Sequence, residues 1–429
     1  MTKATPGRAW PTLDAALFAA GLVVYALGLP LGLARVEAAP QVAAGIAFDT
    51  SSEPAVWGLF ALRIAGYIPI GDYPLRANLA SAGLSALALA LLGRLCIDIL
   101  VLLRPAAKAR QEARDFLQEP IAAAAAALAA ALSLSAYDVA TTGGSAAATM
   151  LLLAAGLLVG LGLVRDCTMA ASGWALAGLA GFSAGVDAAA GWLLWPLLVG
   201  LGIWGLRKGA RWPLLAPLAF VAAWGGSVLA TVARSSAPLA LGGVLARHGG
   251  LPTRGGPGLW ATAVELGDQI GVVGALLAVV GLVVVAMRAS LVGAWLALTL
   301  LSAMLFGHAA APVGAGPWRA ALPLAVAASC VFAAAGLLHV ASRLGRARLA
   351  ATAALSVMLV LTPAMDGRRG SLGRRPALAV HLLARALDRA ELGSVVDPGT
   401  PEMDGLFRLA RAMAWRPDLV IGKAADKSR

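Results

Sequence analysis

The chain has 429 residues, of which 60% are hydrophobic and only 13% are charged, whereas soluble domains carry about 25% charged residues. A single soluble core could not bury so much apolar surface, because core growth stalls near about 250–300 residues. The formal net charge of +12 falls mostly in short segments between apolar runs, and no basic groove with interleaved aromatic residues is evident. We therefore predict an all-α polytopic membrane protein whose partner is the lipid bilayer and not nucleic acid.

Eleven apolar stretches are long enough to cross a hydrocarbon core of about 30 Å. They cover residues 12–34, 78–103, 119–137, 140–164, 168–186, 188–206, 213–233, 269–287, 290–307, 318–341 and 347–365. Alanine, glycine and leucine dominate them, and small residues let helix backbones approach closely in lipid. The pattern predicts about eleven transmembrane helices in a domain of residues 1–365.

Lysine and arginine mark one side of these spans. Lys3 and Arg8 precede the first span, and Arg165 and Arg288 follow the fourth and the eighth. Since cytoplasmic loops carry an excess of these residues, we expect the N-terminus in the cytoplasm and, after eleven spans, the C-terminus outside. The arginines of residues 366–376 oppose this assignment of the C-terminus, and one missed span would reverse it.

Two outer loops are long in this topology, at residues 35–77 and 234–268. Within the first loop, residues 56–70 are apolar around a central Arg63 and are too short for a span, which predicts an interfacial or re-entrant helix. The second loop carries four cationic or imidazole side chains among glycines and prolines, namely Arg234, Arg247, His248 and Arg254.

The segment after the last span, residues 366–429, has a different pattern. Apolar and charged positions alternate at helical period over residues 377–391, and an amphipathic helix is expected over 402–415. Short strands are expected at 394–396 and 419–421. This order predicts the beginning of a small extramembrane α/β unit.

Charged and sulfur-containing residues within the spans have structural interpretations. Arg94 and Asp98 lie four residues apart on the second span, so they share a helix face, and we expect an ion pair there rather than a transport role. Cys96, Cys167 and Cys330 lie in or beside apolar spans and are expected to be small buried apolar residues.

Two stretches resemble one known family. Residues 68–79 read IPIGDYPLRANL before the second span, and residues 415–420 read WRPDLV in the tail. Both are similar to segments of a glycosyltransferase-C-type family of multi-pass membrane proteins, which includes an animal endoplasmic-reticulum O-mannosyltransferase and bacterial homologues. The resemblance implies transfer of a sugar, with mannose as the one it points to, from a polyprenyl phosphate to a protein or glycan. It also implies a bacterial inner membrane, with transfer at its outer face.

The resemblance further implies a catalytic carboxylate in the first outer loop. By spacing, the acid of the family falls near Glu37, and Asp49 and Glu53 are the other carboxylates of this loop. A carboxylate beside an acceptor hydroxyl can act as the base that activates it. The alternative for Glu37 is a solvated acid or an ion pair with Arg35.

Cations near the outer face are candidates for binding the donor phosphate, since arginine can grip phosphate through two parallel hydrogen bonds. These candidates are Arg63, Arg76, Arg234, Arg247, His248, Arg254 and Arg319. The alternative for each is snorkelling, in which the charged head stays in water beside lipid. Asp138 and Asp187, at outer ends of spans, are expected at the mouth of a cavity. No residue spacing predicts a metal site, and a divalent metal stays open as a cofactor.

Two other functions compete with glycosyl transfer. The loop elements of the family are only partly matched here, which leaves open a catalytically inactive relative that serves as a scaffold or accessory subunit in envelope assembly. A lipid-linked sugar transporter would have inverted repeats and helices broken near the bilayer midplane. The sequence shows no internal repeat, so the transporter ranks third.

Overall fold

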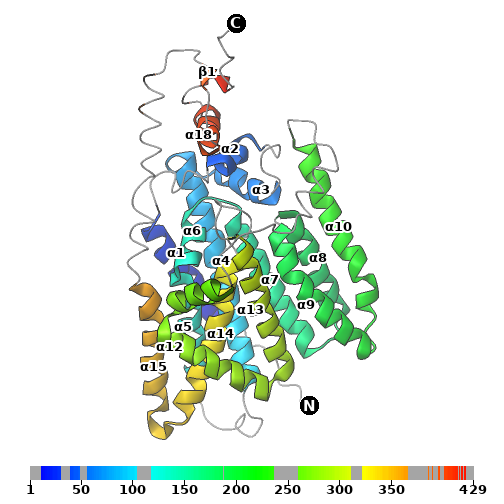
Figure 1. Ribbon diagram of the computed structural model, residues 1–429, viewed down its shortest axis with the longest axis vertical. Coiled ribbons are helices and arrows are strands. Elements are labelled where there is room, and N and C mark those ends of the chain that lie inside the picture. Colours follow the sequence, from blue (N-terminus) through cyan, green and yellow to red (C-terminus); the bar gives the residue numbers. More distant parts are fainter. Residues whose placement is uncertain are drawn as a thin grey trace.

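The structure is a computed structural model of the chain. It describes residues 11–29, 39–48, 56–103, 117–186, 188–235, 259–310 and 321–365, and in the tail residues 385, 389, 395–396, 401–413, 415, 417–418 and 420–421. Helices make up nearly all of the described chain (Figure 1).

A helix lies at each of the eleven positions predicted for spans. These helices are α1 (Pro11–Leu27), α4 (Tyr73–Leu102), the pair α5 (Gln118–Leu132) and α6 (Leu134–Thr141), α7 (Ala146–Arg165), α8 (Ala170–Val186), α9 (Ala188–Arg207), α10 (Trp212–Ala233), α12 (Leu259–Arg288), α13 (Ser290–Ala310), α14 (Ala321–Ser342) and α15 (Arg348–Ala364), with a 3-10 turn η5 (Gly345–Ala347) before α15. Within the described residues, six helices are long and apolar enough to cross a membrane, or seven if α5 and α6 form one bent span. The protein is therefore a multi-pass helical membrane protein, with fewer qualifying spans than the eleven predicted.

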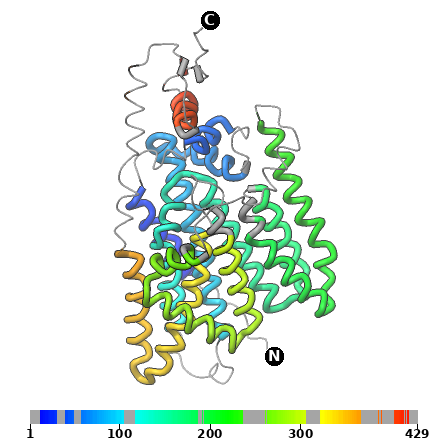
Figure 2. The backbone as a smooth tube through the Cα atoms, in the orientation of Figure 1, coloured from blue at the N-terminus to red at the C-terminus, as the bar shows by residue number. Residues whose placement is uncertain are grey.

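The helices form two groups on either side of α4 and α7. In Figure 2, the green helices α8, α9 and α10 lie on one side, and the yellow-green α12, the yellow α14 and the orange α15 lie on the other. The two groups meet through α13, which contacts both α9 and α14. Nearly every residue of α14 from Ala321 to Leu337 is buried, so α14 is a central helix of the bundle.

Glycines set the closest helix contacts. A Cβ on Gly281 of α12 would overlap the carbonyl oxygen of Phe332, and one on Gly336 of α14 would overlap that of Leu277. A Cβ on Gly181 of α8 would meet the backbone of α10 in the same way. This close approach is the small-residue packing expected where lipid supplies no hydrophobic driving force between helices.

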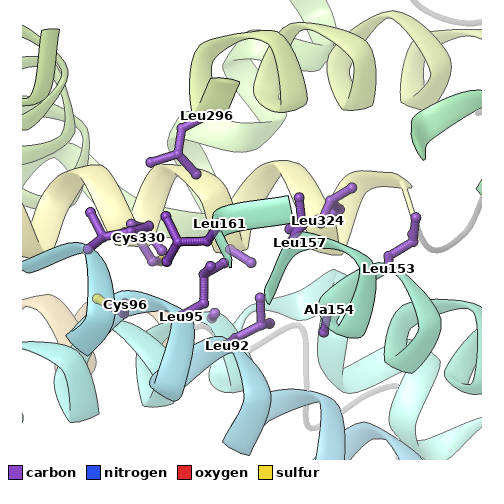
Figure 3. Close-up of a cluster of buried hydrophobic side chains, with 14 of the residues drawn as sticks. Leu92, Leu95, Cys96, Leu153, Ala154, Leu157, Leu161, Leu296, Leu324 and Cys330 are labelled. Atoms are coloured by element: carbon purple, nitrogen blue, oxygen red, sulfur yellow. The ribbon is translucent and has the colours of Figure 1, made fainter. Parts of the chain in front are cut away.

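The core between α4, α7 and α14 is apolar. Figure 3 shows Cys96 of α4 and Cys330 of α14 among leucines that include Leu95 and Leu161. All three cysteines are buried free thiols, as predicted.

Two helices are broken. The axes of α5 and α6 meet at 66° around Ser133, whose Oγ accepts from the amide of Ala136 and so caps the start of α6. Helix α12 is kinked at Gly271, which has a φ of 71°, a conformation that glycine adopts without the steric cost of a side chain.

One end of the bundle carries the short elements of the first predicted outer loop and of the tail. They are α2 (Ala39–Ala47), α3 (Val56–Ala65), α18 (Pro401–Ala412) and the strands β1 (Val395–Val396) and β2 (Val420–Ile421), which pair in parallel. In Figure 1, α18 lies on α2, at the end of the molecule away from η5. The helices α2 and α3 and the tail therefore share one end of the bundle, and the predicted strand, helix and strand of the tail are present.

Candidate functional site

Four predicted site residues lie in the described part of the chain, and they are Arg63, Arg76, Arg234 and Asp138. Eight lie outside the described residues, and they are Glu37, Asp49, Glu53, Asp187, Arg247, His248, Arg254 and Arg319.

Arg63 is an exposed residue of α3, the helix predicted at residues 56–70. Helix α3 buries Leu59 and Leu62, while Phe60 and Ile64 keep 45% and 52% of their surface exposed. Nη1 of Arg63 donates a hydrogen bond to the carbonyl oxygen of Ile46, in the last turn of α2. Carbonyls there lack an intrahelical partner and carry partial negative charge. Arg63 therefore links α3 to the last turn of α2, and the acceptor of this hydrogen bond is a carbonyl oxygen with no formal charge.

Arg234 reaches the same place from the other predicted outer loop. It follows the last residue of α10, and its side chain is exposed. The guanidinium carbon lies 5.0 Å from the centroid of the Phe48 ring, within the range of a cation–π interaction. Phe48 comes directly after α2 and has a φ of 52°, which is uncommon for a residue with a side chain. Arg63 and Arg234 therefore contact positions 46 and 48, at one end of α2.

An aromatic cluster surrounds this point. Phe48 and Phe60 lie 6.2 Å apart between ring centroids, Trp57 and Phe60 the same distance, and Trp57 and Phe182 of α8 4.9 Å apart. Nε1 of Trp57 donates to Oγ of Ser227 on α10 at 2.9 Å. We call Phe48, Trp57, Phe60, Arg63 and Arg234 the cation–aromatic site. The bond and the ring contacts of Trp57 hold α3 against α8 and α10, so the site rests on the bundle.

Arg76 has a different role. Its Nε, Nη1 and Nη2 donate to the carbonyl oxygens of Ile70, Gly66 and Gly71 at 3.1, 2.8 and 2.9 Å. These three bonds shape the turn between α3 and α4. Phosphate binding by Arg76 would require their release.

Asp138 lies half-buried on α6, where its backbone carbonyl accepts from both the amide and the hydroxyl of Thr142. One turn earlier on α6, the amide and Oγ of Ser135 both donate to Oε1 of Gln269, and Nε2 of Gln269 donates to Oε1 of Glu265 at 2.9 Å. Gln269 is only 2% exposed. This polar junction joins the two broken helices.

The sequence interpretation missed the polar junction. It assigned Glu265 to the loop of residues 234–268 and began the span at residue 269, whereas α12 begins at Leu259. Glu265 and Gln269 lie four residues apart just before Gly271, and this helical spacing was the available signal.

The far end of α4 carries an ionic network. Nε of Arg94 lies 3.5 Å from a carboxylate oxygen of Asp98, Nη1 of Arg94 lies 3.9 Å from Asp14 of α1, and Nη2 of Arg165 of α7 lies 3.7 Å from Asp98. The predicted pair of Arg94 and Asp98 is confirmed. Its two other members come from α1 and α7, so the network joins three helices.

Within the described residues, no group of three or more His, Cys, Asp or Glu side chains could hold a metal ion. No family model matches the sequence, and no curated protein matches it. The geometry of the sites therefore carries the functional argument.

Proposed function

We propose that the protein is a membrane glycosyltransferase that moves a sugar, with mannose as the first to test, from a polyprenyl-phosphate donor to a protein or glycan at the outer face. The observation that carries the proposal is that Arg63 contacts Ile46 and Arg234 contacts Phe48, at one end of α2. The proposed topology keeps eleven spans, with α1, α8, α9 and α13 crossing the membrane and the N-terminus in the cytoplasm of a bacterial cell.

The charges of Arg63 and Arg234 are available to an anion. Among the described residues, neither forms an ion pair, and their contacts are with a neutral carbonyl and a neutral ring. A hydrogen bond between a guanidinium and a phosphate is about twice as strong as one between neutral groups. An entering phosphate can therefore replace these contacts.

Lipid-compatible surface adjoins the two arginines. Phe60 and Ile64 flank Arg63 on α3, and Leu229 and Val232, 69% and 36% exposed, precede Arg234 on α10. Exposed apolar side chains beside a cation suit a ligand that has an apolar chain and a phosphate head. A polyprenyl phosphate has this chemistry, whereas a soluble nucleotide sugar has no apolar chain.

The base that activates the acceptor is proposed to be an acid of the first outer loop, with Glu37 as the first candidate and Asp49 and Glu53 as the others. Asp49 is the residue that follows Phe48 in the sequence.

The proposal is tested with the full chain in lipid nanodiscs supplied with radiolabelled polyprenyl-phosphate mannose and a membrane extract as acceptor. We expect label in protein or glycan, lost in Glu37→Gln or in one of Asp49→Asn and Glu53→Gln. Transfer that survives all three substitutions would show that no acid of this loop is the base. Donor capture without transfer, in the wild type and in every variant, would favour the inactive scaffold or accessory subunit.

One observation favours the transporter as a second function. The bend of α5–α6 and the kink of α12 are joined by Ser135 and Gln269, and broken helices that meet are typical of transporter binding sites. Movement of a fluorescent polyprenyl-phosphate sugar across proteoliposomes, abolished by Gln269→Leu, would support transport over transfer.

A further inference from the structure

The tail helix α18 is docked on α2. Its apolar residues Leu406, Phe407, Leu409 and Ala410 are buried in one cluster with Ala39, Val42, Ala43 and Ala44 of α2 and with Leu59 and Leu62 of α3. Gly405 faces Pro40 so closely that a Cβ on it would lie 2.5 Å from Cγ and 2.7 Å from Cδ of that proline. Strand β1 precedes α18 in the sequence and β2 follows it, and the two strands pair with each other in parallel. Helix α18 therefore approaches α2 closely, and this approach depends on the absence of a side chain at Gly405.

The same cluster continues to the cation–aromatic site. Ile46 and Phe48 are partly buried against it, and these are the positions that Arg63 and Arg234 contact. Helix α2 has nine residues, and isolated helices shorter than about 12–15 residues are marginal in water. The position of α2 therefore depends on its packing against neighbouring elements.

Other contacts hold α2 from the opposite side. Oε1 of Gln41 accepts from the amide of Ser145 at 3.2 Å in the turn before α7, and Gly45 lies against Leu62 of α3. These contacts locate α2 on the bundle. The tail helix packs on its outer side, so α2 is held between the bundle and the tail.

We propose that α18 is a positioning element of the donor site. By docking on α2 it sets Ile46 and Phe48 at the spacing that brings the guanidinium groups of Arg63 and Arg234 to one phosphate. The inference rests on the proposed function for the identity of the ligand. It adds that the extramembrane tail, and Gly405 and Phe407 in particular, governs recognition of the phosphate although neither residue touches it.

The experiment measures photocapture of a diazirine-labelled polyprenyl phosphate by the full chain in nanodiscs, with labelled polyprenol as the uncharged counterpart. Gly405→Ala forces α18 or α2 to shift, and Phe407→Asp undocks α18 without touching a span. We expect each to lower capture of polyprenyl phosphate about tenfold, the scale of one lost charge-assisted hydrogen bond, with capture of polyprenol unchanged. Arg63→Ala and Arg234→Ala should also lower capture of polyprenyl phosphate about tenfold and leave capture of polyprenol unchanged.

Two matched variants control for general damage. Arg408→Ala removes the exposed 2.8 Å pair with Asp404 on α18 and should leave capture unchanged. Pro40→Ala removes Cγ and Cδ, the two proline atoms nearest to a Cβ at position 405, and leaves only the backbone nitrogen at 3.2 Å. The double variant with Gly405→Ala should therefore regain capture.

The outcomes separate the inference from the proposed function. If the arginine variants lose phosphate capture while the two tail variants keep it, the proposed ligand stands and the positioning role is wrong. An equal loss of polyprenyl phosphate and polyprenol in the tail variants would also overturn it, since that is general damage and not loss of phosphate recognition. If the arginine variants capture the phosphate normally, the ligand assignment fails, and the inference fails with it.

Discussion

The two ends of the bundle use arginine in opposite ways. At the far end of α4, Arg94 and Arg165 lie against the carboxylates of Asp14 and Asp98. At the end that carries α2, α3 and the tail, Arg63 and Arg234 contact a carbonyl and a ring, with no ion pair among the described residues.

The difference separates cations that are paired with carboxylates inside the bundle from cations that have no ion pair among the described residues. A charge within an apolar span must be paired, because removing one partner of a buried pair leaves an uncompensated charge. A cation at the rim keeps access to water, so it can remain without an acid until an anion arrives. The partners of an arginine therefore indicate its role better than its position in the sequence does.

The largest effect is expected from breaking the ionic network. Among the described residues, Asp98→Asn leaves Arg94 with only the longer contact to Asp14 and leaves Arg165 without a carboxylate, which we expect to lower the free energy of unfolding by about 3 kcal/mol. Thermal unfolding in detergent measures this. Asp404→Asn breaks an exposed pair on α18 and should cost less than about 0.5 kcal/mol. Equal melting temperatures for the two variants would show that the network contributes no more than a surface pair.

A smaller loss is expected at the polar junction, where the bonds involve a neutral amide. Gln269→Leu removes the acceptor of two hydrogen bonds from Ser135 and the donor to Glu265, and unsatisfied buried groups cost about 1–3 kcal/mol. We expect about 2 kcal/mol in the same unfolding assay. A variant as stable as the wild type would show that the two broken helices do not depend on this amide.

Arg63→Ala and Arg234→Ala should change binding more than stability. Each should weaken the affinity for polyprenyl phosphate about tenfold, or about 1.4 kcal/mol, because one charge-assisted contact is lost. The free energy of unfolding should change by less than about 0.5–1 kcal/mol, since both side chains are exposed. A large loss of stability would place these arginines in the same class as Arg94.

The smallest change in stability is expected at Asp166, whose carboxylate accepts a hydrogen bond from a hydroxyl. Asp166, in the turn between α7 and α8, accepts from both the hydroxyl and the amide of Thr168, and these bonds hold the pKa of the exposed Asp166 carboxyl below its usual range. A lowered folded-state pKa stabilises the protein above the unfolded pKa, and this stabilisation disappears as the pH falls through the folded value. Thr168→Val should therefore lower the melting temperature slightly at pH 7, and the difference should vanish in acid. A difference that persists below the folded pKa would trace to packing instead.

Much of the fold could be predicted from local pattern. Long apolar stretches gave a helix at every predicted position, because a chain in lipid must satisfy its backbone within the helix. The i, i+4 spacing of Arg94 and Asp98 predicted their pair, since that spacing is a property of one helix. The amphipathic stretch of the tail predicted α18 for the same reason.

The features that the sequence did not predict have physical causes as well. Length and composition do not show where a helix breaks, so the break at Ser133 and the early start of α12 at Leu259 went unseen. The hydrogen bonds of Arg76 to the turn of residues 66–71 were also invisible, because a loop arginine has the same local pattern whether it binds backbone or ligand.

By itself, the sequence determined that this is a multi-pass membrane protein of apolar helices with a strand–helix–strand tail, because hydropathy and helical periodicity act locally along the chain. Only the tertiary structure decided which cations lie at the end of α2. Arg63 lies on α3 and Arg234 directly after α10, 171 positions later in the sequence, yet they contact positions 46 and 48. That proximity comes from the packing of α2, α3, α10 and α18, which depends on contacts between distant segments.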